Sequence, residues 1–249
     1  MLLTPGNRKL GGDLIWSFSL PSGTPEVCVG MTDLCRRHCY AARFETYRRA
    51  ARAKFVRNLA ATRRPDFARR IRGLIVACEI KVVRIHTGGD FHSPAYARQW
   101  LRVCRGLPRT RFYFYSRSWR DAAIRVALEE MAALPNVRAW YSCDRETGLP
   151  NDLPPGVRIA WLQTDADDIP PTSAGIVFRV RALRPRPQAE INGARVCPSE
   201  DGIPRDAALA CDRCGHCWKP LPATEPSRVP SLPLLAPAGA AAPFLERRP

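Results

Sequence analysis

The stretch KVVRIHTGGDFHSPAYARQWLRVCRGLPRTRFYFYS (residues 81–116) contains a strand, a turn, a helix and a second strand. Residues 81–86 are rich in β-branched side chains and residues 111–115 in aromatic ones, and both compositions are typical of buried strands. Between them, Ser93 and Pro94 predict the start of a helix, because serine caps free backbone N–H groups and proline fits the first turn. The stretch therefore predicts two parallel strands joined by a helix.

Segments of the same kind flank this stretch. A strand is expected within residues 13–23, a helix at 118–134, and strands without clear intervening helices at residues 137–141, 157–163 and 175–180. Alternating strands and helices favour an α/β fold with a parallel sheet. We therefore predict a partial parallel (β/α) barrel of about six strands over residues 1–190. A cysteine-rich metal-binding extension at 191–220 and a disordered Pro/Ala-rich tail at 221–249 are expected to follow it.

Two helices are expected between the first strand and residue 81. In the first, apolar residues at helical spacing predict one buried face, made of Phe44, Tyr47, Ala51, Phe55 and Leu59. Its other faces carry the arginines Arg48, Arg49, Arg52 and Arg57. The second helix follows Pro65 and is expected to bury Phe67, Ile71, Leu74 and Cys78. Cys78, and Cys104 in a later helix, are therefore interpreted as small core residues and not as metal ligands.

The sequence CDRCGHCW (residues 211–218) places Cys211, Cys214 and Cys217 on one tight loop. Zinc sites usually combine two separated C-x-x-C pairs, whereas three closely spaced thiolates suit a 4Fe-4S cluster. Cys197, which precedes a proline, offers a fourth ligand. We expect a closed iron–sulfur cluster here, with structural zinc as the alternative. Disulfides are not expected, because no secretory signal opens the chain and a cytoplasmic location is predicted.

A second cysteine group, consisting of Cys28, Cys35 and Cys39, lies in the loop after the first predicted strand. Three thiolates can hold three irons of a four-iron cluster and leave the fourth iron open to a substrate or cofactor. This group therefore predicts a reactive centre. A zinc site completed by His38 is the alternative, since zinc accepts both cysteine and imidazole ligands.

Polar residues follow the next predicted strands directly. In such folds the carboxyl ends of parallel strands meet at one edge and form the active site. Gly88 and Gly89 would let the backbone approach a ligand closely, and Asp90 would accept a hydrogen bond from a ligand amino group. Ribose or substrate contacts are expected from Ser116, Arg117, Ser142 and Asp144. The catalytic candidates are Asp90, Arg117 and Asp144.

The cysteine loop and the Gly-Gly-Asp turn together resemble the radical S-adenosylmethionine enzymes. In that superfamily a three-cysteine loop holds a cluster whose open iron chelates S-adenosylmethionine, and a Gly-Gly-Glu turn binds the amino group of this cofactor. The resemblance implies the same roles for the first cysteine group and for residues 88–90. The chain departs from the usual pattern in three ways. Its cysteines are separated by six and then three residues, Asp90 replaces the glutamate, and His38 replaces an aromatic residue.

A closer resemblance involves PGNRKLG, IWSFSLP, CRRHCYA, HTGGDFHS, YSRS and the final cysteine triplet. Together these motifs are similar to the bacteriophage gene-product-88 family from about Pro5 to Trp218. The resemblance supports an iron–sulfur, radical-enzyme-like architecture and does not specify a reaction.

The net charge of +16 comes from 39 basic residues, almost all of them arginines. This charge would attract polyanions, so nucleic acid is a candidate partner, and a solvated basic surface is the simpler alternative. No apolar run approaches the ~20 residues of a membrane span.

Two functions remain open. One is an iron–sulfur enzyme for a nucleic acid or another anionic substrate, supplied with electrons by a flavodoxin or ferredoxin. The other is a metal-stabilised nucleic-acid-binding protein that contacts phosphate through its arginine-rich first helix and an exposed RSWR stretch at 117–120.

Overall fold

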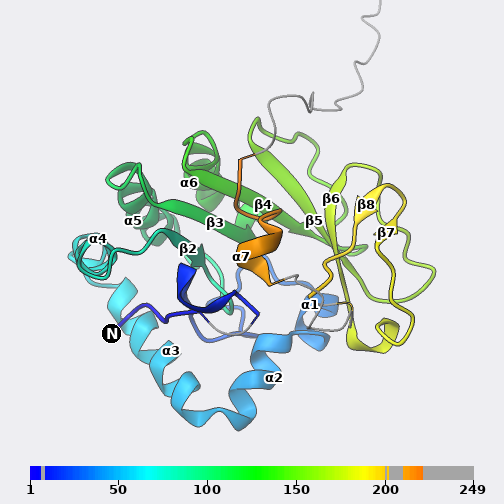
Figure 1. The fold of residues 1–249 in the computed structure, drawn as a ribbon, viewed down its shortest axis with the longest axis horizontal. Coiled ribbons are helices and arrows are strands. Elements are labelled where there is room, and N and C mark those ends of the chain that lie inside the picture. The colour runs from blue at the N-terminus through cyan, green and yellow to red at the C-terminus, as the bar shows by residue number, and fades with distance from the viewer. Residues whose placement is uncertain (7–8, 200, 202–209, 221–249) are drawn as a thin grey trace, which may run out of the picture.

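The computed structural model describes residues 1–6, 9–199, 201 and 210–220, so the tail expected at 221–249 lies outside the described residues. Within them, a six-stranded parallel sheet forms the centre of the molecule, and its strands are ordered in space as in the chain (Figure 1). This confirms the α/β class. The strands are β1 (Ile15–Phe18), β2 (Val82–Ile85), β3 (Arg111–Ser116), β4 (Val137–Cys143), β5 (Val157–Gln163) and β6 (Ala174–Arg179). A short antiparallel pair, β7 (Glu190–Ile191) and β8 (Ala194–Arg195), follows the sheet.

Most helices lie between the early strands. Five of them precede β3, namely α1 (Asp33–Arg37), α2 (Tyr40–Tyr47), α3 (Arg49–Thr62), α4 (Phe67–Ala77) and α5 (Pro94–Arg105). They are followed by α6 (Ala122–Ala132) before β4 and by α7 (Cys211–Cys214). The Ser93 hydroxyl accepts a hydrogen bond from the backbone N–H of Tyr96, which confirms the predicted cap of α5. Loops without helices connect β4 to β5 and β5 to β6, as the sequence predicted.

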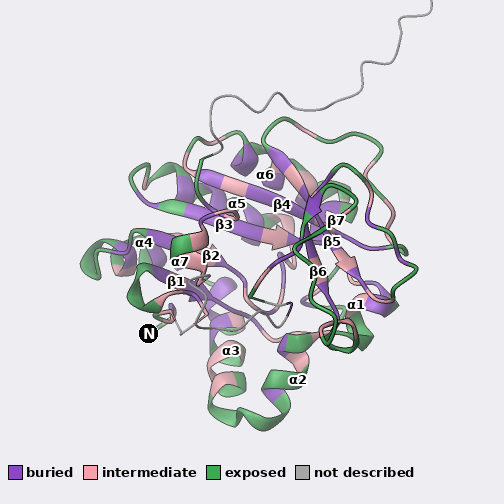
Figure 2. Cartoon of the chain, turned by 45° about the vertical axis from the view of Figure 1, so that its right-hand side comes forward, coloured by how far each residue is buried: buried purple, intermediate pink, exposed green. Residues whose placement is uncertain are grey.

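Different parts of the chain cover the two faces of the sheet. Because successive side chains of a strand point to opposite faces, β3 directs Phe112 and Phe114 to one side and Tyr113 and Tyr115 to the other. The phenylalanines join the large core beneath α4, α5 and α6. On the tyrosine side, the C-terminal segment around α7 packs against the sheet (Figure 1). Figure 2 shows the strands as mostly buried and the outer turns of α2 and α3 as mostly exposed.

The helical segment after the first cysteine group differs from the prediction. Two helices form in place of one, because Arg48 leaves the helical conformation with φ −110° and ψ 69° between α2 and α3. The buried residues of α2 are Ala41 and Glu45, so Phe44 and Tyr47 lie 38% and 69% exposed and do not form the predicted apolar face.

Two further burial predictions are wrong. Helix α4 buries Phe67, Ile71 and Ile75, and it ends at Ala77. Cys78 therefore follows the helix and is exposed, whereas Cys104 is buried as expected. The RSWR stretch is also mostly buried, because Arg117, Ser118 and Trp119 pack inside the molecule and only Arg120 of these four is exposed.

Among the described residues, no helix has the length and apolar character needed to cross a membrane.

Candidate functional site

A cavity of about 740 Å³ lies at the carboxyl ends of the strands, over the tyrosine face of the sheet. Its wall brings together three parts of the chain that are far apart in the sequence. These are the first cysteine group with its loop, the turn at residues 88–90, and strand residues that include Tyr115 and Ser142. Arg117 also lines the cavity. Ser116 and Asp144 are not among the lining residues and support the wall through hydrogen bonds.

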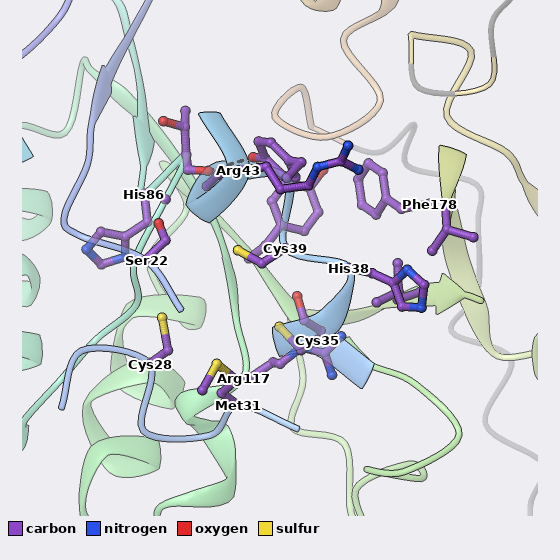
Figure 3. Close-up of a pocket in the computed structure, with 18 of the residues that line it drawn as sticks. Ser22, Cys28, Met31, Cys35, His38, Cys39, Arg43, His86, Arg117 and Phe178 are labelled. Atoms are coloured by element: carbon purple, nitrogen blue, oxygen red, sulfur yellow. Dashed lines mark hydrogen bonds between the residues drawn. The ribbon is translucent and has the colours of Figure 1, made fainter. Parts of the chain in front are cut away.

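The three thiols of the first cysteine group face a common space in Figure 3, with Met31 beside them. Burial, together with the smaller effects of the nearby Asp90, Cys35 and Cys39, raises the pKa of Cys28 to about 12. Burial also raises the pKa of Cys35, although Arg117 opposes this effect. Cys28 and Cys35 are therefore protonated at neutral pH, and a metal that binds them must displace protons. His38 is exposed, and its ring points away from the three sulfur atoms (Figure 3).

The loop that carries these cysteines is held by Thr32. Its hydroxyl accepts a hydrogen bond of 3.0 Å from the N–H of Cys35, which caps α1, and it donates one of 2.8 Å to Asp144 Oδ2. Gly30 packs closely against the residue that follows β3. A Cβ atom on Gly30 would lie 1.9 Å from the carbonyl oxygen of Arg117. The six residues between the first two cysteines therefore dock the loop onto β3 and β4.

Asp90 holds the end of β3 beneath the glycine turn. Its carboxylate accepts hydrogen bonds from the Ser116 hydroxyl (2.7 Å) and from the N–H groups of Phe91 (2.8 Å), Arg117 (2.7 Å) and Ser118 (3.2 Å). A carboxylate has about four acceptor positions, so the protein itself uses the capacity that we expected a ligand amino group to take. In this structure Asp90 positions the wall of the cavity.

Arg117 and Asp144 form a buried ion pair, with Nη1 2.7 Å from Oδ2. The other oxygen of Asp144 accepts hydrogen bonds of 2.9 Å from the N–H groups of Glu146 and Thr147. Asp144 thus connects the cysteine loop, through Thr32, to the end of β3. Because removal of one partner from a buried pair leaves an uncompensated charge, the pair fixes the position of this side of the cavity.

The two glycines of the turn are needed for close backbone packing. A Cβ atom on Gly88 would lie 2.5 Å from Ser22 Oγ, and one on Gly89 would lie 2.5 Å from Leu20 Cβ. Gly89 also has a φ of +75°, which favours glycine. The segment after β1 therefore occupies the space that the sequence led us to assign to a ligand.

The second cysteine group consists of Cys197, Cys211, Cys214 and Cys217, and it lies on the same face of the sheet. Trp140 Nε1 donates to the carbonyl of Cys217 (3.0 Å), and Trp218 Nε1 donates to the carbonyl of Cys211 (2.9 Å). Burial raises the pKa of Cys217 to about 12, although a hydrogen bond with Tyr115 opposes this effect. None of these four cysteines lines the cavity, which separates the second group from the first.

Arg84 is a site residue that the sequence analysis missed. Its Nη2 donates to the Tyr40 hydroxyl (3.3 Å), and its guanidinium lies 5.4 Å from the centre of the Tyr115 ring. Burial raises the pKa of Cys211 and Cys217 in the second cysteine group, and the positive charge of Arg84 opposes this rise. Arg84 also lines the cavity into which the first group opens, so it is near both groups. The sequence held one signal for this role, since Arg84 is a charge inside the otherwise apolar strand VVRI.

The charged residues that line the cavity are mostly basic. Within the described residues they comprise Asp90 and seven cations: Lys9, Arg43, Arg84, Arg117, Arg179, Arg181 and Arg184. Arg117 pairs with Asp144, and Arg179 pairs with the buried Asp201. This predominance of basic side chains in the lining favours an anionic occupant.

Neither cysteine group, taken with the other described residues, forms a site for a single metal ion in this geometry. Among the described residues, no three His, Cys, Asp or Glu side chains are placed to hold one ion. Because each thiolate of a four-iron cluster binds a different iron, a cluster needs its sulfur ligands farther apart than a single ion does.

Comparisons with known proteins identify the family. The profile of a family described as Gene product 88 matches residues 1–220. The Gene 88 protein of Mycobacterium phage L5 is 28% identical over 227 residues, which cover 85% of each chain. The Gene 88 protein of Mycobacterium phage D29 is 29% identical over 150 residues, which cover 56% of this chain and 60% of the relative. No solved structure matches the chain. With this match over most of its length, the chain belongs to the Gene product 88 family.

Proposed function

We propose that the protein is an iron–sulfur enzyme with a radical S-adenosylmethionine-like site. One observation carries the proposal: the first cysteine group opens into a cavity at the carboxyl ends of a parallel sheet, whereas the second group does not line this cavity. In this proposal Cys28, Cys35 and Cys39 hold a 4Fe-4S cluster with one open iron. The second group holds a structural or electron-carrying cluster. The sequential strand order of β1 to β6 supports the partial-barrel architecture that such a site needs.

The donor set favours clusters over mononuclear zinc. All ten cysteines are free, and seven of them belong to the two groups. The ring of His38 points away from the first group, which argues against a zinc site that this residue completes (Figure 3).

The proposed cluster would supply one-electron reduction to a cofactor in the cavity. The protein's own residues would hold and orient the reactants. Arg84 and Arg43 offer charge-assisted hydrogen bonds to carboxylate or phosphate groups. Gly88, Gly89 and Asp90 shape the wall, and Arg117 and Ser142 contact the bound molecule. Because the electron must come from outside, a flavodoxin or ferredoxin is the proposed reductant.

Metal analysis after anaerobic reconstitution with iron and sulfide tests this proposal. Two four-iron clusters predict about eight irons and eight sulfides per chain. Cys35→Ser should lower both numbers to about half, and Cys78→Ser is the matched control because Cys78 is exposed and belongs to neither group. Stoichiometric zinc without sulfide would contradict the proposal. That result would leave the second candidate, a metal-stabilised nucleic-acid-binding protein, which the exposed arginines of α3 favour.

A further inference from the structure

Helix α2 exposes aromatic side chains at the mouth of the cavity. Phe44 is 38% exposed and Tyr47 is 69% exposed, and their rings meet edge to face with centroids 6.0 Å apart. Tyr47 also lines the cavity. Large aromatic side chains gain free energy when they are buried, so an exposed pair beside a cavity is typical of a binding surface.

Arginines surround this aromatic pair. Arg43 lies on α2 and lines the cavity, Arg48 and Arg49 follow Tyr47 directly, and Arg181 lines the cavity from the segment after β6. In the part of the chain that the structure describes, none of these four arginines takes part in the ion pairs. They therefore present full positive charges to a partner.

The combination selects one class of partner. Single-stranded nucleic acid offers unpaired bases that stack on aromatic rings and phosphates that bind arginine, whereas a duplex hides the faces of its bases. An acidic protein would satisfy the arginines without a need for the rings. The cavity beside the rings, at about 740 Å³, lies within the ordinary size range of small-ligand pockets.

We propose that α2 and the cavity mouth bind single-stranded nucleic acid and direct one nucleotide into the cavity. The strand stacks bases on Phe44 and Tyr47 and binds phosphate through Arg43, Arg48 and Arg181. Helix α3 extends the basic surface with Arg52 and Arg57, which are exposed. Binding at this surface does not require a metal, and only the reaction of the inserted nucleotide rests on the proposed function.

Fluorescence anisotropy tests the proposal with labelled single-stranded DNA and RNA and the matching duplexes, at about 50 mM salt. The protein should bind the single strands more tightly than the duplexes. Tyr47→Ala and Arg43→Gln should each weaken single-strand binding by about tenfold, as expected for one stacked base or one phosphate contact. The matched controls are Val126→Ala on α6 and Arg98→Gln on α5, which are exposed on helices that pack against the opposite face of the sheet.

The outcomes separate this proposal from its competitors. Equal loss of binding in the controls would reduce the site to general surface charge and overturn it, as would duplex binding that Tyr47→Ala leaves unchanged. No binding to either nucleic acid would also overturn it, and self-association that Tyr47→Ala abolishes would assign the face to a second copy of the chain. Failure of the cluster proposal is recognised separately, because it changes iron and sulfide content and leaves these affinities unchanged.

Discussion

At the scale of single residues, two buried carboxylates hold the proposed site together. Asp90 fastens the end of β3 to the turn after β2, and Asp144 joins Arg117 to Thr32 of the cysteine loop. Each accepts hydrogen bonds from the backbone of a loop as well as from a side chain. The carboxylates therefore position loops that carry the cavity wall.

Replacement of Asp90 by asparagine should destabilise the protein. The amide has one acceptor oxygen, so at least one of the four buried donors around residue 90 loses its partner, at a cost of about 1–3 kcal/mol. Urea unfolding followed by circular dichroism measures the change in the free energy of unfolding. Asp13→Asn is the control because Asp13 is exposed. An Asp90→Asn protein as stable as this control would show that the network contributes nothing.

His86 predicts a dependence of stability on pH. Its Nε2 and the Tyr96 hydroxyl share a hydrogen bond of 2.8 Å, and this hydroxyl also accepts a hydrogen bond from Trp100 Nε1. Burial, together with the smaller effects of the charges of His92 and Arg84, lowers the pKa of His86 to about 3. The unfolded chain binds a proton at the ordinary pKa of 6.5 and the folded chain does not. The contribution of His86 is therefore complete above pH 6.5 and is lost as the pH falls toward 3, by up to about 1.4 kcal/mol per pH unit.

The variant His86→Asn tests this dependence. Asparagine tolerates the left-handed backbone of residue 86, where φ is 65°, and it does not titrate. Denaturant unfolding at several pH values between 6.5 and 3 should give a shallower loss of stability for the variant than for the wild type. Parallel curves for the two proteins would show that His86 does not cause the loss.

At the scale of elements, the cysteine loop depends on the short helix α1. Thr32 caps this helix and also donates to Asp144, so Thr32→Val removes a cap and leaves a buried acceptor with one fewer donor. We expect a loss of about 1–2 kcal/mol in stability and a weaker hold on metal by the first cysteine group. Iron analysis of the variant after dialysis against a chelator tests this. Retention equal to wild type would contradict the role of Thr32, and Thr46→Val on exposed α2 serves as the control.

Elements with a strong local pattern were predictable from the sequence, whereas their contacts were not. The β-branched and aromatic runs of β2 and β3 and the Ser93 cap act through neighbouring residues, so the sequence alone indicates them. The predicted burial of Phe44 failed because α2 ends at Tyr47 and packs through Ala41 and Glu45. Three of the four partners of Asp90 lie 26 to 28 residues away, and Arg84 meets Tyr40 across 44 residues. Such contacts depend on how the elements pack.

At the scale of the whole molecule, the second cysteine group fastens the C-terminal segment to the sheet. Trp218 and Cys217 pack with residues of β1, β2 and β3, and Cys197 packs with Trp140 of β4. If the second group holds metal as proposed, Cys214→Ser should lower the metal content, and the melting temperature should fall by several degrees with the loss of that metal. Differential scanning fluorimetry and metal analysis check the two effects. Metal content equal to that of Cys78→Ser would contradict the assignment.

The central claim is that the first cysteine group holds a cluster whose open iron faces the cavity. Electron paramagnetic resonance of the reduced Cys214→Ser protein tests it most directly, because this variant is expected to lose the second centre and leave the first to be observed alone. The account predicts a cluster signal that changes when S-adenosylmethionine is added and disappears in the additional Cys35→Ser variant. A signal that S-adenosylmethionine leaves unchanged, or the absence of a cluster in a protein that binds zinc, would contradict the account.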